Sequence, residues 1–223
     1  MRTTFHNELI ELRGLLGEMA TLAAAAMRQA TEAMLTADLA QAERVLAADS
    51  QLDKLRDRCE DQAQQMLALQ APVAGDLRTV LSSIYCADKL ERMGDLAEHI
   101  ASTSRRNHPD PLVPDELRPA FIDLGSIAAG MADRLVELLA EPVAGGFAEL
   151  DEVDHEMDAL HADVLRQVTA KCWPHGVRSA TCLALVARFF ERYADQAVSV
   201  AKRVEFVSTG KTPSHPGPPV SHP

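Results

Sequence analysis

Apolar residues recur every three or four positions along most of the chain, which is the pattern of amphipathic helices. One such stripe runs through Cys86, Leu90, Met93 and Ile100. No segment combines sustained alternation of apolar and polar residues with turn signals, so no strand is expected. The pattern predicts an all-α protein.

Prolines divide this pattern into segments, because a proline inside a helix costs about 3 kcal/mol and therefore marks a helix boundary. A further break is expected near Thr36 to Asp38, where Asp38 can cap the next helix and Gln41 can act as its reciprocal partner. The chain is then expected to form six helices, over residues 4–36, 38–70, 75–106, 115–140, 147–171 and 176–208.

The two halves of the chain repeat each other. Residues 77–106 align without a gap to residues 177–206, with identical residues at Arg78/Arg178, Ala87/Ala187, Glu91/Glu191, Arg92/Arg192, Asp95/Asp195, Ala97/Ala197 and Ala101/Ala201. Three helices with short connections pack as an antiparallel bundle. The sequence therefore predicts two tandem three-helix bundles related by internal duplication.

The domain boundaries follow from this repeat and from the proline-rich stretches. The first bundle is expected over residues 1–108 and the second over 120–210, with a proline-rich linker at 109–119. The tail at 211–223 is rich in proline, contains two histidines and lacks apolar periodicity, so it is expected to be disordered.

Composition narrows the possible functions. The formal net charge is −11, which argues against a surface that neutralises nucleic-acid phosphates. The sequence shows no secretory signal and no apolar stretch of the roughly 20 residues that a membrane-spanning helix needs, so a cytoplasmic location is expected. The four cysteines form no CxxC pair and are expected to be reduced and buried.

The repeat carries a Glu-Arg-x-x-Asp motif, which places Glu91/Asp95 and Glu191/Asp195 on matching helices. Residues four apart lie on the same helix face, so each motif directs two carboxylates to one place. The preceding helix of each half carries a similar pair, Asp53/Asp57 in the first and Asp154/Asp158 in the second. Gly94 and Ala194, inside the motifs, are small enough to allow close approach of a neighbouring helix or a ligand.

Paired acidic residues repel each other, and a cation would explain why the duplication retains them. Carboxylate ligands suit Mg, Mn, Ca or Fe. Two alternatives stay open: a solvated acidic face neutralised by Arg92 or Lys89, and a carboxylate-bridged iron storage or oxidase protein. The iron alternative needs two Glu-x-x-His motifs, and only Glu152/His155 has that form. No catalytic nucleophile with a partner is visible, so no enzyme activity is expected.

The motif-bearing segments at 70–101 and 188–204 resemble the two copies of the signature helix of the PhoU family. The resemblance covers about residues 1–210. It implies the six-helix PhoU fold, a homodimer, and divalent or trivalent metal ions (Fe, Mn, Mg or Zn as candidates). Carried over by position, the ligands are Glu91, Asp95, Glu191, Asp195, Asp53, Asp57, Asp154 and Asp158.

The resemblance also implies a function. PhoU proteins are negative regulators of the phosphate-starvation (Pho) response, thought to connect the PstSCAB phosphate transporter, through its ATPase PstB, to the two-component sensor kinase PhoR. An iron storage or oxidase protein and a metal-free helical adaptor remain the alternatives. The second half departs from the family pattern at Gly176 and Arg188, which stand opposite Asp76 and Asp88. A weaker second metal site is therefore expected.

Overall fold

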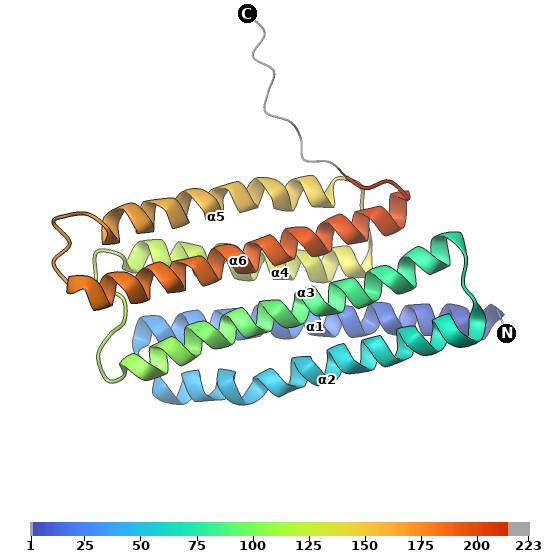
Figure 1. Ribbon diagram of the computed structural model, residues 1–223, viewed down its shortest axis with the longest axis horizontal. Helices are drawn as coiled ribbons and strands as arrows, with labels where there is room; N and C mark the ends of the chain where they lie inside the picture. The colour runs from blue at the N-terminus through green and yellow to red at the C-terminus, as the bar shows by residue number, and fades with distance from the viewer. Residues whose placement is uncertain (1, 214–223) are drawn as a thin grey trace, which may run out of the picture.

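Six long helices make up nearly all of the structure (Figure 1). The computed structural model describes residues 2–213 of the 223-residue chain, with side chains from Phe5 onward. The helices are α1 (Arg2–Thr36), α2 (Leu39–Gln70), α3 (Ala74–Asn107), α4 (Arg118–Ala140), α5 (Gly146–Val168) and α6 (Gly176–Thr209). The prediction of an all-α fold with six helices is confirmed, and no described residue lies in a strand.

The predicted break between α1 and α2 is present, with one change in its hydrogen bonds. The Asp38 carboxylate accepts a hydrogen bond of 2.9 Å from the backbone N–H of Gln41 and so caps α2. The expected reciprocal bond is absent, because the backbone N–H of Asp38 donates to the carbonyl of Ala33. The Gln41 side chain donates instead to Glu32, at 2.7 Å.

Two helix boundaries differ from the prediction. The fourth helix begins at Arg118 rather than at residue 115, because a turn closed by hydrogen bonds to the Pro114 carbonyl precedes it. The fifth helix ends at Val168 rather than at residue 171. The connection between α3 and α4 buries Leu112 and Val113, so this proline-rich segment packs onto the bundle.

Each half contributes three helices, and the two halves join through inner pairs. Contacts link α1 with α4 and α3 with α6, whereas α2 packs on α1 and α3, and α5 on α4 and α6. As a result, α2 and α5 lie on opposite outer sides of the molecule (Figure 1). The buried side chains of both halves form one continuous core.

Gly94 of α3 lies directly against α2 in the first half. A Cβ atom at this position would lie only 2.3 Å from Cδ1 of Leu52 on α2. Gly94 therefore lets α2 and α3 pack closely at the level of Asp53 and Asp95, as its small size predicted. The equivalent residue in the second half, Ala194, is fully buried.

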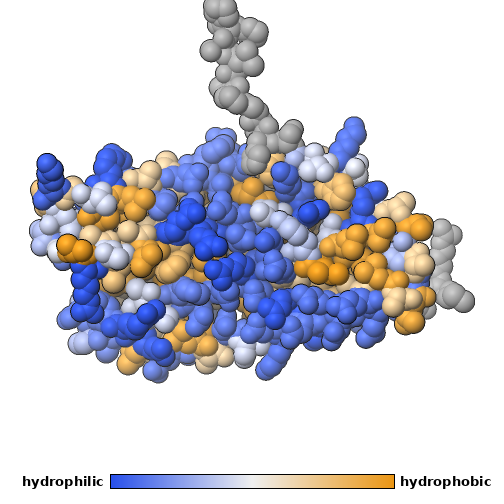
Figure 2. Space-filling model, viewed as in Figure 1, coloured by the Kyte–Doolittle hydropathy of each residue, from blue (hydrophilic) through white to orange (hydrophobic). Residues whose placement is uncertain are grey.

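The surface is mostly polar, with an apolar patch over the first turns of α3, where Leu81 is exposed (Figure 2). No described helix is long and apolar enough to cross a bilayer. The four cysteines are free, and Cys59 and Cys86 are buried as predicted. The prediction is wrong for Cys172, which is exposed because it lies in the turn between α5 and α6. The predicted disorder of the tail concerns residues mostly outside the described part.

Candidate metal centre

The four predicted carboxylate pairs form two clusters, one in each half. Asp53 and Asp57 on α2 lie beside Glu91 and Asp95 on α3, because α2 packs directly on α3. The second cluster combines α5 and α6, which also pack together, and its residues are Asp154, Asp158, Glu191 and Asp195. The duplication therefore places equivalent acidic residues at equivalent helix contacts.

Two arginines of the same half pair with the first cluster. Arg56 of α2 reaches across to Glu91 at 2.6 Å and also pairs with Asp57 at 3.0 Å and Asp53 at 3.5 Å. Arg92 pairs with Asp95 at 2.6 Å. Each of the four carboxylates thus has a cationic partner. Burial and the neighbouring charge of Asp95 raise the pKa of Glu91, and the Arg56 guanidinium opposes that increase.

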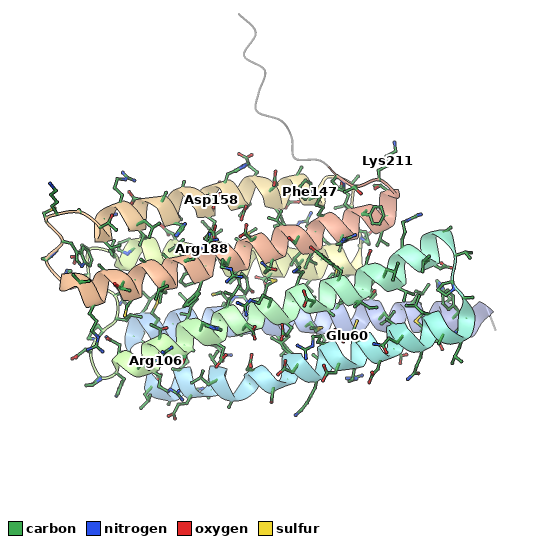
Figure 3. The ribbon with its side chains drawn as sticks, in the orientation of Figure 1. Glu60, Arg106, Phe147, Asp158, Arg188 and Lys211 are labelled. Carbon is green, nitrogen blue, oxygen red and sulfur yellow. The ribbon has the colours of Figure 1, made fainter. Side chains whose placement is uncertain are left out.

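The second cluster lacks the equivalent of Arg56. With the second-half carboxylate pair aligned to the first, Met157 occupies the position of Arg56, and it is fully buried in the core. Arg188 of α6 pairs with Oε1 of Glu191, and Figure 3 shows Arg188 and Asp158 on neighbouring helices. Within residues 5–213, no ion pair links the three aspartates of this cluster to a cation.

Two buried carboxylate oxygens of the second cluster have no hydrogen-bond partner among the described residues. They are Oδ1 of Asp154 and Oε2 of Glu191. Burial and the charges of Asp158, Asp195, Glu191 and Asp151 raise the pKa of Asp154 to about 7. The pKa values of Glu191 and Asp195 are also raised, again chiefly by burial. These are the properties of a carboxylate cluster whose negative charge is only partly compensated.

Two further residues belong to these clusters and were not predicted. His161 lies two turns after Asp154 on α5, and its Nε2 atom is buried without a partner in the described structure. In the first half, Asp49 of α2 has a raised pKa caused by burial, then by Glu98 and Asp95. The seven-residue spacing of Asp154 and His161 was a usable sequence signal, whereas Asp49 has no acidic counterpart in the second half.

The carboxylates of the two clusters do not form a closed coordination shell in the described structure. Among the residues that the structure describes, no three His, Cys, Asp or Glu side chains are grouped closely enough to hold a metal ion. Glu152 and His155, the only Glu-x-x-His pair, have largely exposed side chains and lie 3.9 Å apart. They do not face a bundle interior, as a ferritin-like iron site would require.

The fold and its paired acidic clusters define a duplicated six-helix protein, and comparison with known proteins identifies its family. The PhoU domain model matches residues 16–103 and 121–204, which is one match in each half. The chain belongs to the PhoU family.

Similar proteins span nearly the whole chain. Phosphate-specific transport system accessory protein PhoU homolog 1 of Mycobacterium tuberculosis is 42% identical over 214 residues, covering 96% of this chain and 97% of its own. PhoU homolog 2 of the same species is also 42% identical, with 96% and 100% covered.

Two solved structures share the fold. A phosphate transport system regulatory protein PhoU from Streptococcus pneumoniae superposes with a TM-score of 0.84 at 22% identity, covering 94% of this chain and 99% of its own. PhoU from Pseudomonas aeruginosa gives a TM-score of 0.84 at 23% identity, with 93% and 100% covered. The predicted fold of two three-helix bundles in tandem is thereby confirmed.

Proposed function

We propose that this chain is a cytoplasmic accessory protein of a phosphate transport system and a negative regulator of the phosphate-starvation response. The observation that carries the proposal is the match to PhoU relatives, which are named as transport accessory proteins, at 42% identity over 96% of the chain. The chain would act as an adaptor without enzyme activity, linking the ATPase PstB to a PhoR-type sensor kinase, as a homodimer.

The regulatory role is tested by deleting the gene and measuring phosphate-starvation transcripts in high phosphate. We expect these transcripts to rise in the deletion strain and to return to the basal level when the wild-type gene is supplied. Because two homologues occur within one species among the relatives, any second copy in the host is deleted as well. Full repression in a strain without any copy would contradict the proposal.

The adaptor role predicts specific partners. Capture with a tagged chain from membranes of cells grown in high phosphate should recover PstB and the sensor kinase, and capture from phosphate-starved cells should recover less of the kinase. Recovery of neither protein under either condition would contradict the linkage but not the regulatory role, which the deletion experiment tests separately.

We also propose that the second cluster binds a hard or borderline metal ion such as Mg²⁺, Mn²⁺ or an iron ion. Its carboxylates suit such ions, and the unpartnered oxygens of Asp154 and Glu191 are buried acceptors that a cation would satisfy. Asp158 and Asp195 would complete the acidic set. When bound, the ion would supply charge compensation and hold α5 and α6 together.

The first cluster fits a metal less well, because the Arg56 guanidinium already contacts three of its carboxylates. A cation there would need Arg56 to turn away from Glu91. The charge arrangement therefore favours the second site over the first, opposite to the expectation from sequence.

Metal analysis of purified protein tests this ranking. We expect Glu191→Ala/Asp195→Ala to lose most of the bound metal and Glu91→Ala/Asp95→Ala to lose less. Asp110→Ala/Asp115→Ala, on the connection between α3 and α4, serves as a control of equal charge change. Equal and negligible metal in wild type and all variants would contradict the metal proposal, and leave a metal-free adaptor.

A further inference from the structure

A small cavity lies between the two halves, and residues near the start of α3 and the end of α6 line it. These two helix ends lie at the same end of the molecule (Figure 1). Its volume is about 40 Å³, which is room for about three water molecules at roughly 10–15 Å³ each. Helices α1, α3, α4 and α6 all contribute to its wall. The carboxylate clusters contribute no residue to it.

Two of the residues that line the cavity are arginines, and none is acidic. Arg13 of α1 and Arg203 of α6 are both in its wall. Neither arginine forms an ion pair or a side-chain hydrogen bond within the described residues; Arg203 rests on the ring of Tyr85, 4.3 Å from its centroid. The carboxylate nearest in sequence, Glu205, accepts hydrogen bonds from the backbone N–H groups of Gly145 and Phe147. The Glu205 carboxylate is therefore already bound at the start of α5 and does not pair with Arg203 in the described structure.

A third arginine adds positive charge at the same end. Arg78 lies over the ring of Phe206, one turn after Arg203, at 5.9 Å from the ring centroid. Its Nε atom is buried and has no hydrogen-bond partner in the described structure. Three guanidinium groups that form no ion pair among the described residues therefore gather at one end of a chain of net charge −11.

The hydroxyl groups of the cavity provide both a donor and acceptors. Ser82 is 5% exposed and its hydroxyl makes no hydrogen bond among the described residues. Thr79 and Ser83 also line the cavity, but their hydroxyls donate to the carbonyls of Gly75 and Thr79. Ser82 is thus free to donate to a ligand, whereas Thr79 and Ser83 can offer it only their oxygen lone pairs.

The rest of the wall is apolar. Leu16, Leu139, Pro142, Val204 and Val207 surround the polar groups. Charge-assisted hydrogen bonds are shorter and stronger than neutral ones, and apolar surroundings strengthen them further. An anion held here would have its charge compensated by the partly buried Arg203 and the exposed Arg13.

We propose that this cavity binds a protonated phosphate ion through Arg13, Arg203 and Ser82. Guanidinium groups present paired N–H donors that match the oxygens of phosphate or sulfate. Hydrogen phosphate also carries an O–H that can donate to Thr79 or Ser83, and sulfate has none. The cavity therefore distinguishes the two ions. This proposal does not depend on the regulatory function.

Isothermal titration with inorganic phosphate tests the proposal on the full chain, in a buffer without other oxyanions. We expect saturable binding that sulfate at the same concentration displaces poorly. Arg203→Gln and Arg13→Gln should each weaken binding about tenfold or more, because each removes a hydrogen bond to a charged group. Arg44→Gln, at an exposed arginine without an ion pair in the described structure, changes the net charge equally and should bind as wild type.

A hydroxyl variant and a dialysis control separate this cavity from other ways of binding phosphate. Ser82→Ala removes a hydroxyl that has no partner, so it should fold normally and weaken phosphate binding more than sulfate binding. Phosphate bound through a metal at the carboxylate clusters would disappear after dialysis against a chelator, so binding must persist in dialysed protein. Loss on dialysis, absence of saturable binding, equal affinity for sulfate, or wild-type affinity in the folded Arg13→Gln variant would each overturn the proposal.

Discussion

The two halves of the molecule share a duplicated set of carboxylates but compensate their charge differently. Arg56 contacts three of the four first-half carboxylates, while the buried Met157 stands at its place in the second half. Among the described residues, Arg188 forms an ion pair with Glu191 alone. In the described part of the chain, the first half thus pairs each of its carboxylates with an arginine, and the second half retains unpartnered buried oxygens. A retained motif therefore does not imply a retained electrostatic environment.

The largest effect is expected from the close helix contact that brings the first cluster together. Gly94→Val would push a branched side chain into Leu52, whose Cδ1 lies 2.3 Å from the position of an added Cβ. Overpacking of this kind reduces stability by about 1–3 kcal/mol. Urea unfolding measures the loss. Gly130→Val, where an added Cβ meets nothing within 4 Å, controls for helix propensity. Similar losses in both variants would contradict a special role for Gly94.

Replacing Arg56 by methionine, the residue type at the matching position 157 of the second half, should make the two clusters alike. Arg56→Met leaves Glu91 partly buried without its 2.6 Å partner, and we expect a stability loss of about 1–2 kcal/mol in chelator. Added Mn²⁺ should restore more stability to this variant than to wild type. Arg58→Met, at an exposed position on the same helix, should change stability by less than about 0.5 kcal/mol. An unchanged Mn²⁺ response would refute the compensation argument.

A charge removal in the second cluster should stabilise metal-free protein. Burial and neighbouring carboxylates raise the pKa of Asp154 to about 7, above its ordinary 3.8. The folded state therefore holds a proton that the unfolded chain has lost, and stability falls as pH rises toward 7. Asp154→Asn should gain about 1 kcal/mol at pH 8, allowing for solvent screening of a half-buried group, and much less at pH 5.

The matched variant for this experiment is Asp61→Asn, which removes an exposed charge without a partner in the described structure. Asp53→Asn extends the comparison to the first half, where the lost pairing with Arg56 should make the change neutral or destabilising. Thermal unfolding of all three variants at both pH values checks the signs. A destabilised Asp154→Asn protein at pH 8 in chelator would contradict the prediction.

The smallest effect is expected in the labelling of the native cysteines. They are buried in the first half and more accessible in the second. Burial raises the pKa values of Cys59 and Cys86 to about 12, so neither forms thiolate near neutral pH. Cys172 is exposed and should be labelled rapidly by a maleimide, with Cys182 slower. Mass spectrometry of the labelled peptides checks this order. Rapid labelling of Cys59 in native protein would contradict the packed first half.

Much of the fold could be predicted from the sequence because its signals are local. Asp38 and the prolines mark helix ends, and the stripe through Leu90 and Met93 marks the buried face. The ion pairs within the carboxylate clusters could not be predicted in the same way. Whether Arg56 reaches Glu91 depends on how α2 packs against α3, and that packing depends on Gly94 and Leu52. The cavity at Arg203 was also missed, since its wall combines four helices that are distant in sequence.

The contact between α3 and α6 joins the two helices that carry the Glu-Arg-x-x-Asp motifs of the two clusters. The His99 ring, one turn beyond Asp95, lies 5.3 Å from the ring of Phe189, two residues before Glu191. A ligand that shifts α6 would perturb this ring pair and, through it, α3. We expect occupancy of one half to change the affinity of the other by a common factor in both directions, as thermodynamic linkage requires. The affinities of the duplicated halves would then be linked rather than independent.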